Sequence, residues 1–108
     1  MIAQTLAEAA IPRPRGRLSA RLEPRGRGHR LIVANVGTAS VTVEGVEVEP
    51  SNTVLGTEDL AGAELEPGED YSLPAAITFG TKLPLAVALR WQDSSGESEE
   101  RTQTVPLP

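Results

Sequence analysis

The sequence predicts an all-β protein, an antiparallel β-sandwich of about seven strands preceded by a short N-terminal helix and arm. From Leu18 onward, apolar side chains recur at every second residue, which is the period of a strand with one buried face. Groups of Gly, Pro, Asn, Asp and Ser interrupt these stretches at spacings of about ten residues, as in sandwich proteins. The chain shows neither strand–helix alternation nor a glycine-rich phosphate loop, which argues against a parallel α/β fold.

Length and composition restrict the function classes. With 108 residues the chain suits one domain, which would bury roughly 65% of its unfolded surface. It has no cysteine and one histidine, which excludes disulfides, thiolate metal sites and multi-histidine metal sites. One Trp, one Tyr and one Phe are too few for a stacking platform for single-stranded nucleic acid. We therefore expect no cofactor, no metal site, no catalytic residues and no enzymatic activity.

Residues 2–10 favour a helix. Ile2, Leu6 and Ala9 lie on one helical stripe, and alanine dominates the rest of the segment. A helix of about nine residues is not stable alone in water, so it must dock on another surface or fray.

Pro12 and Pro14 end this helix and favour an extended linker. The sequence therefore predicts two parts. Residues 1–16 form the N-terminal helix and a Pro- and Arg-rich arm, and residues 17–108 form the sandwich.

Alternation predicts the first two strands over residues 17–23 and 30–36, joined by a turn at 24–28. The third strand begins at Val41 but changes phase before Val46. A β-bulge at Gly45 and a break into two short strands explain this change equally well, because one extra residue shifts the register.

The second half of the chain begins with a loop at residues 50–53 and weak strand candidates at 54–55 and 63–65. A strong turn at 66–69 precedes a strand that Pro74 marks as an edge or ends. The clearest strand spans residues 83–92, and its inward face holds Leu85, Val87, Leu89 and Trp91. After a hairpin turn at 93–96, the last strand runs over residues 101–107 with Val105 and Leu107 inward.

Three segments of the sequence combine a strand with a characteristic turn. They are Asn35-Val36-Gly37 between two strands, Leu65-Glu66-Pro67-Gly68-Glu69, and the hairpin Trp91-Gln92-Asp93-Ser94-Ser95-Gly96. Together they resemble the CARDB-like and fibronectin type III-like immunoglobulin-like domains of bacteria and their phages. The resemblance covers residues 17–107 and implies an immunoglobulin-like fold and an adhesion, spacer or accessory role, but no particular ligand. The chain differs from secreted members in lacking an export signal, and from antibody domains in lacking a cysteine pair.

Charge is distributed unevenly along the chain. Residues 1–30 contain seven arginines and two acidic residues, whereas the remainder contains three basic and thirteen acidic residues. Such asymmetry predicts an arm that meets an acidic surface. We expect a protein partner, or a second copy of the chain, to be bound through an apolar stripe and arginine–carboxylate pairs. The residues assigned to this role are Ile2, Leu6, Ala9, Arg13, Arg15 and Arg17.

Two other charged features allow alternatives. The stretch from Glu44 to Asp70 has nine carboxylates and no Lys or Arg; a solvated acidic face explains it, with a calcium site as the alternative. The tetrads Pro14-Arg15-Gly16-Arg17 and Pro24-Arg25-Gly26-Arg27 look like the core of an AT-hook, which places an extended Arg-Gly-Arg in a minor groove. They lack the proline that would follow in that motif, and the second is also explained as a turn.

The sequence thus predicts a non-enzymatic structural or accessory subunit that docks on a larger protein assembly through its N-terminal arm, for example a virion decoration or connector protein. The alternatives are a cell-surface adhesion or ligand-binding module and a nucleic-acid-associated protein. No apolar run approaches the ~20 residues that cross a bilayer, so we expect no membrane segment. The start of the chain lacks an export signal, which predicts cytoplasmic synthesis and a place in the cytoplasm or a virion. A fragment of a longer chain could instead belong to the cell surface.

Overall fold

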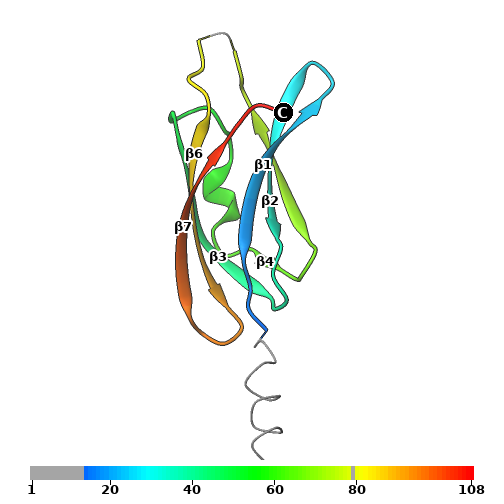
Figure 1. The fold of residues 1–108 in the computed structure, drawn as a ribbon, viewed down its shortest axis with the longest axis vertical. Coiled ribbons are helices and arrows are strands. Elements are labelled where there is room, and N and C mark those ends of the chain that lie inside the picture. Colours follow the sequence, from blue (N-terminus) through cyan, green and yellow to red (C-terminus); the bar gives the residue numbers. More distant parts are fainter. Residues whose placement is uncertain (1–13, 79) are drawn as a thin grey trace, which may run out of the picture.

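The computed structural model describes residues 14–78 and 80–108. This part of the chain is mostly β, with seven strands in two antiparallel sheets (Figure 1). This confirms the predicted strand content and fits the predicted sandwich. In chain order the elements are β1 (Leu18–Arg25), β2 (Gly28–Asn35), β3 (Val41–Glu49), the 3-10 helix η1 (Thr57–Leu60), β4 (Glu64–Leu65), β5 (Asp70–Ala75), β6 (Leu85–Asp93) and β7 (Ser98–Val105). The predicted helix at residues 2–10 lies outside the described residues.

The first sheet has the strand order β1-β2-β5, and the second has the order β4-β3-β6-β7. All neighbouring strands are antiparallel. β1 and β2 form a tight hairpin in which Arg25 pairs with Gly28. Gly26 occupies this turn with φ 59°, a left-handed conformation that glycine adopts without steric cost.

The core lies between the two sheets. Leu85, Val87, Leu89 and Trp91 on β6 are at most 2% exposed, as the alternation predicts. They belong to one cluster with residues of the opposite sheet, among them Leu18 of β1 and Leu31 of β2. The inward faces of both sheets therefore share a single apolar core, which is the arrangement that stabilises a two-layered β fold.

The phase change in β3 is a bulge. Val43 pairs with Trp91, and Gly45 rather than Glu44 pairs with Arg90, so Glu44 is the extra residue. Val43 and Val46 are consequently both buried. The bulge is confirmed, and the alternative of two separate strands is wrong. A Cβ at position 45 would lie 2.7 Å from Arg90 Nη2, the end of a flexible side chain that can move aside.

Three local features of the structure differ from what the sequence predicts. Residues 54–55 form one bridge, between Val54 and Ala75, rather than a strand. The unpredicted helix η1 follows and buries Leu60 completely. The inward placement of Leu107 is wrong: β7 ends at Val105, which pairs with the first residue of β6, and Leu107 is 44% exposed. With no strand left to pair with and Pro106 lacking an N–H, the chain leaves the sheet there.

The loops gather at the two ends of the sandwich (Figure 1). Residue 14, the β2–β3 loop, the β4–β5 turn and the β6–β7 hairpin share one end, which we call the N-terminal end. The β1–β2 hairpin and the C-terminus lie at the opposite end. The described chain therefore enters and leaves the sandwich at opposite ends.

Candidate functional site

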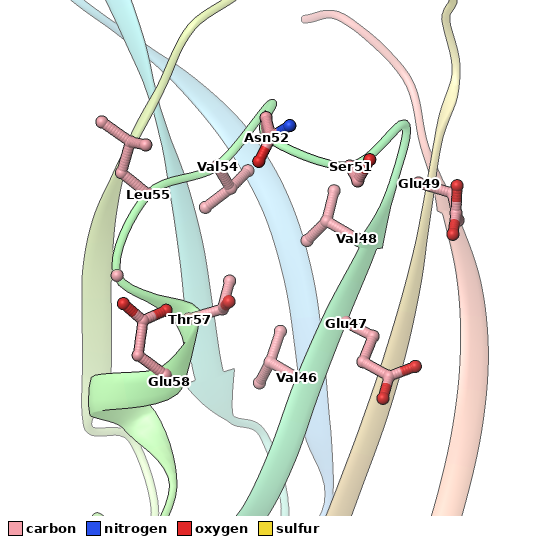
Figure 2. Close-up of a pocket in the computed structure, with 11 residues that line it drawn as sticks. Val46, Glu47, Val48, Glu49, Ser51, Asn52, Val54, Leu55, Thr57 and Glu58 are labelled. Carbon is pink, nitrogen blue, oxygen red and sulfur yellow. The ribbon is translucent and has the colours of Figure 1, made fainter.

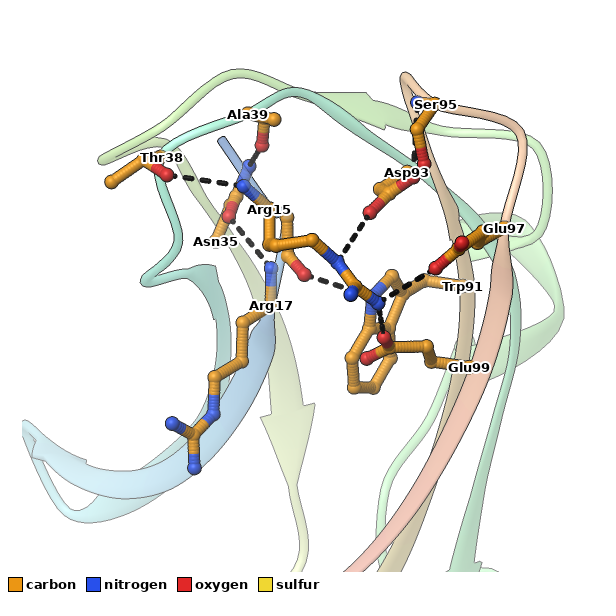
Figure 3. A network of polar contacts seen from close by, with 11 residues as sticks. Arg15, Arg17, Asn35, Thr38, Ala39, Trp91, Asp93, Ser95, Glu97 and Glu99 are labelled. Atoms are coloured by element: carbon orange, nitrogen blue, oxygen red, sulfur yellow. Dashed lines mark hydrogen bonds and ion pairs between the residues drawn. The ribbon is translucent and has the colours of Figure 1, made fainter. Parts of the chain in front are cut away.

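The candidate site lies at the N-terminal end, where residues 14–17 lead into β1 beside the β2–β3 loop (Figure 3). Their backbone is fixed on both sides of Gly16. The Arg15 carbonyl accepts a hydrogen bond from Thr38 N at 2.8 Å, and the Arg17 carbonyl accepts one from Val36 N at 2.8 Å. Arg15 N donates to Thr38 Oγ1 at 3.1 Å. These hydrogen bonds hold residues 15–17 against the β2–β3 loop, just before β1 begins.

The Arg15 guanidinium joins this segment to the β6–β7 hairpin. Its Nε donates to Asp93 Oδ2 at 3.2 Å, and its Nη2 lies 3.0 Å from Glu97 Oε2. The same Nη2 also pairs with Glu99 Oε1. We call these four residues the Arg15 cluster (Figure 3). The Asp93 side chain is fully buried, whereas that of Arg15 is 48% exposed, so solvent screens much of this attraction.

Asp93 is positioned by its own hairpin. Its Oδ1 accepts a hydrogen bond from Ser95 N at 3.0 Å and another from Ser95 Oγ. The Ser95 hydroxyl and amide, together with the positive charge of Arg15, hold the pKa of Asp93 below its ordinary value, although burial opposes them. Asp93 is therefore a carboxylate that orders a turn and anchors Arg15.

Gly16 lets the chain pass close to the core. The Trp91 Nε1 donates to the Gly16 carbonyl at 3.2 Å, which satisfies the one polar atom of a buried indole. A Cβ at position 16 would overlap Val41 Cγ1 and lie 3.1 Å from the Ala39 carbonyl oxygen. Only glycine fits between Trp91 and Val41 here, because the backbone itself lies against the core.

Asn35 links four parts of this end and is 1% exposed. Its Nδ2 donates to the carbonyls of Ala39 at 2.8 Å and Leu65 at 2.9 Å. Its Oδ1 accepts from Gly37 N at 2.9 Å and Arg17 N at 3.3 Å. The amide thus uses both donors and both acceptor positions. It connects residues 14–17 with the β2–β3 loop and β4.

The structure separates the predicted partner-binding residues into three groups. Ile2, Leu6, Ala9 and Arg13 lie outside the described residues. Arg15 is engaged within the chain by the Arg15 cluster. Arg17 is exposed, its guanidinium points away from that cluster, and no ion pair of it occurs among residues 14–78 and 80–108 (Figure 3).

The predicted boundary between residues 16 and 17 divides a packed segment. Residues 14–16 hydrogen-bond to the β2–β3 loop and to Trp91, so the packed unit begins by Pro14. The sequence shows Asp93 and Asn35 only as turn residues and does not identify them as anchors of this segment. Their Asp-x-x-Gly and Asn-x-Gly spacing was the available signal, but it does not show that the N-terminal residues fold back onto both turns.

The two arginine tetrads lie at opposite ends of β1. The first precedes Leu18, and the second extends from the end of β1 into the hairpin turn. Residues 18–23 of β1 lie between them, which places Arg17 and Pro24 roughly 23 Å apart. In the first tetrad, Gly16 is buried and Arg15 is paired, so its backbone cannot enter a minor groove while it is packed in this way.

The acidic stretch shows no metal-binding geometry. Across the described part of the chain, no three His, Asp or Glu side chains are arranged to hold a metal ion. No helix in this part has the length and apolar character needed to cross a bilayer. No family model matches the sequence, and the search of curated proteins finds no match either.

Proposed function

We propose that this protein is a non-enzymatic structural or accessory module that docks on a protein partner through residues 1–13, which we call the N-terminal segment. The observation that carries the proposal is the fixed position of residues 14–17. Arg15 N and Arg17 N donate to Thr38 and Asn35, and Trp91 donates to the Gly16 carbonyl, so these residues hold the start of the sandwich at the end opposite the C-terminus. A partner bound to the N-terminal segment would therefore hold the sandwich in a defined direction.

We propose an immunoglobulin-like topology for the sandwich. The immunoglobulin fold places its strands A, B and E in one sheet and C, F and G in the other. Here β1, β2 and β5 share one sheet, and β3, β6 and β7 share the other, which is the same division in chain order. The short fourth strand pairs with β3 instead of β5. This order and the three turn motifs support the resemblance.

The chemistry of the N-terminal end supports a structural role. Among the described residues, no buried side-chain nitrogen or oxygen lacks a hydrogen-bond partner. The lowered pKa of Asp93 is accounted for by Ser95 and Arg15, which also fix the hairpin geometry. A polar network that is satisfied within the fold rigidifies it, and here the rigid element is the base of the N-terminal segment.

In this mechanism the arginines have different tasks. Arg15 is an internal anchor, whereas Arg13 and the exposed Arg17 pair with carboxylates of the partner. Ile2, Leu6 and Ala9 bury an apolar stripe on the same partner, which supplies the packing that a short helix needs. A virion decoration or connector protein is a concrete example of such a module.

The test compares the full chain with a shortened chain that begins at Pro14, because residues 14–16 belong to the packed unit. Both should unfold at the same urea concentration. Sedimentation velocity and capture from an extract of the source cells should show association for the full chain only, and a synthetic peptide of residues 1–13 should compete with it. Equal association of both chains would overturn the proposal.

Single substitutions sharpen this comparison. Leu6→Asp and Arg13→Glu should each reduce association at least tenfold, because they oppose the apolar and the charged contacts. Arg27→Glu is the matched control: Arg27 is also exposed, but it lies in the β1–β2 hairpin at the opposite end. A loss of association caused by Arg27→Glu alone would assign binding to that hairpin.

A further inference from the structure

The second half of β3 has an open edge. On its outer side β3 pairs with β4 only at Val41 and Thr42. Val43 then exchanges hydrogen bonds with Ala63 and Gly62. Within residues 14–78 and 80–108, the backbone of residues 45–49 pairs only with β6 on the other side. An unpaired edge of this kind is a template for another strand.

A groove of ≈ 450 Å³ runs beside this edge, between β3 and residues 54–58 (Figure 2). Val46, Val48 and Val54 line its apolar side, and Figure 2 shows Val46 and Val48 pointing from β3 toward the segment that carries Val54. Glu47 and Glu49 project from the opposite side of β3. Val46 and Val54 are already buried, so an added strand would pack mainly on the partly buried Val48 on one face, with two carboxylates beside it on the other.

The outer edge of β7 likewise has no backbone partner among the described residues, whereas two other edges are covered at single points. The Gln103 side chain of β7 occupies the edge of β1, accepting from Ala20 N at 3.1 Å and donating to the Ala20 carbonyl at 2.6 Å. The end of β5 is covered by residues 53–55, since Leu55 N donates to the Pro74 carbonyl at 3.0 Å. The β3 edge has no such cover over residues 45–49, and a groove lined by both valines and polar side chains accompanies it.

The N-terminal segment has the sequence of an edge strand just before its base. Ile11 and Arg13 each precede a proline, which disfavours the helical region for both and favours an extended backbone. Pro12 and Pro14 occupy the alternate positions of this segment. In a strand paired with β3, the N–H groups of Ile11 and Arg13 would point toward β3. The nitrogens of both prolines, which carry no hydrogen, would point away from β3, as in other edge strands.

We propose that residues 11–13 of one copy of this chain add as a strand to residues 45–49 of a second copy. The inference rests on the proposed function and identifies the partner as another copy. In this pairing Pro12 packs mainly on Val48, and Arg13 lies beside Glu47 and Glu49. The basic N-terminal residues and the acidic β3 residues are thus complementary in charge as well as in backbone pairing.

Chain geometry requires that the two partners be different copies. Gly16 lies against Val41 at the start of β3. Val48 is seven residues further along β3, roughly 23 Å away at the rise of a strand. Arg13 is three residues from Gly16 and reaches at most about 11 Å from it. The backbone of Pro12 and Arg13 therefore cannot lie beside Val48 and Glu49 of its own chain, as this pairing requires, and successive copies would join end to end.

A peptide titration tests the pairing. A synthetic peptide of residues 1–13 is added to the shortened chain that begins at Pro14, and backbone amide shifts are followed by NMR. The expected changes are confined to residues 45–49 and 54–58. The double substitution Glu47→Lys with Glu49→Lys should weaken binding at least tenfold. Glu100→Lys is the matched control, because Glu100 is an exposed glutamate on β7 of the same sheet, and it should leave binding within twofold.

The absence of native cysteine allows a second test by disulfide trapping. A chain carrying Arg13→Cys, mixed with one carrying Glu49→Cys, should form a disulfide-linked dimer of the two. Pairing with Glu100→Cys should not exceed the background. A chain with both Arg13→Cys and Glu49→Cys should give linked oligomers. An internally linked monomer of that chain, or equal trapping at position 100, would overturn the proposal.

The outcomes separate this inference from the proposed function. If the peptide produces no shifts at residues 45–49 but the full chain still captures another protein through residues 1–13, the second-copy pairing is wrong and the docking role stands. If neither the peptide nor the full chain binds anything, both are wrong. Unchanged urea midpoints for every lysine variant verify that a loss of binding does not arise from unfolding.

Discussion

Replacing Asn35 with alanine should strongly destabilise the N-terminal end of the sandwich. The side-chain amide makes four hydrogen bonds, to Ala39 and Leu65 as donor and from Gly37 and Arg17 as acceptor. Alanine would leave two carbonyls and two amides without these partners, in a position that is 1% exposed. Each such bond has a net worth of about 0.5–1.5 kcal/mol.

The expected loss in the free energy of unfolding is about 3 kcal/mol, near the lower end of that sum because the long bond to Arg17 N contributes little. For a domain of this size the melting temperature should fall by roughly 15 °C. Urea unfolding followed by the fluorescence of Trp91, the one tryptophan of the chain, measures the change. Asn35→Asp should cost at least as much at neutral pH, because a carboxylate would face two carbonyl oxygens.

Thr102→Ala is the control for this prediction. Thr102 lies exposed on β7, and its substitution should change stability by no more than about 0.5 kcal/mol. A loss below about 1 kcal/mol for Asn35→Ala would refute the reasoning, because it would mean that water replaces all four bonds without cost.

Three further outcomes follow from the same end of the fold. Gly16→Ala should lower stability by about 1–3 kcal/mol through overlap with Val41, which urea unfolding measures; a variant as stable as the parent contradicts the close approach. Because the pKa of Asp93 is lowered in the folded state, its carboxylate stabilises the fold at neutral pH, and this stabilisation is lost as the pH falls below about 4. Asp93→Asn should flatten that part of the pH–stability curve. An unchanged curve would exclude this role. Arg15→Ala should cost no more than about 1 kcal/mol, since the ion pairs are half-exposed, yet amide exchange at residues 15–17 should accelerate; protection equal to that of the parent would show that the cluster does not hold the segment.

Alternation with a period of two was sufficient to predict the strands that form the core. The buried face of β6 follows from four apolar residues at every second position, because a strand points alternate side chains to opposite sides. The bulge near Gly45 was also visible as a phase change. The length of β7 was not predictable in this way, because its first seven residues all carry hydroxyl, amide or charged groups and only the last, Val105, is hydrophobic.

The candidate site shows the limit of local patterns. The sequence shows Asn35-Val36-Gly37 and Asp93-Ser94-Ser95-Gly96 as turns, since such residues bond to their own backbone two positions on. It does not show that Arg15, 78 positions away from Asp93, lies between them. The ion pairs of Arg15 and the hydrogen bond from Trp91 to the Gly16 carbonyl form only when the two sheets bring β1 and β6 together.

By itself, the sequence determined which side chains of β6 are inward, where the chain turns and that the basic residues precede the acidic ones. These properties are local, because backbone geometry and glycine or proline chemistry fix them within a few residues. Only the tertiary structure decided that residues 14–17 are part of the sandwich, that the tetrads lie at opposite ends and that half of β3 lacks a neighbour. Each of these depends on which distant segments meet, and non-local contacts of this kind leave no periodic trace in one sequence.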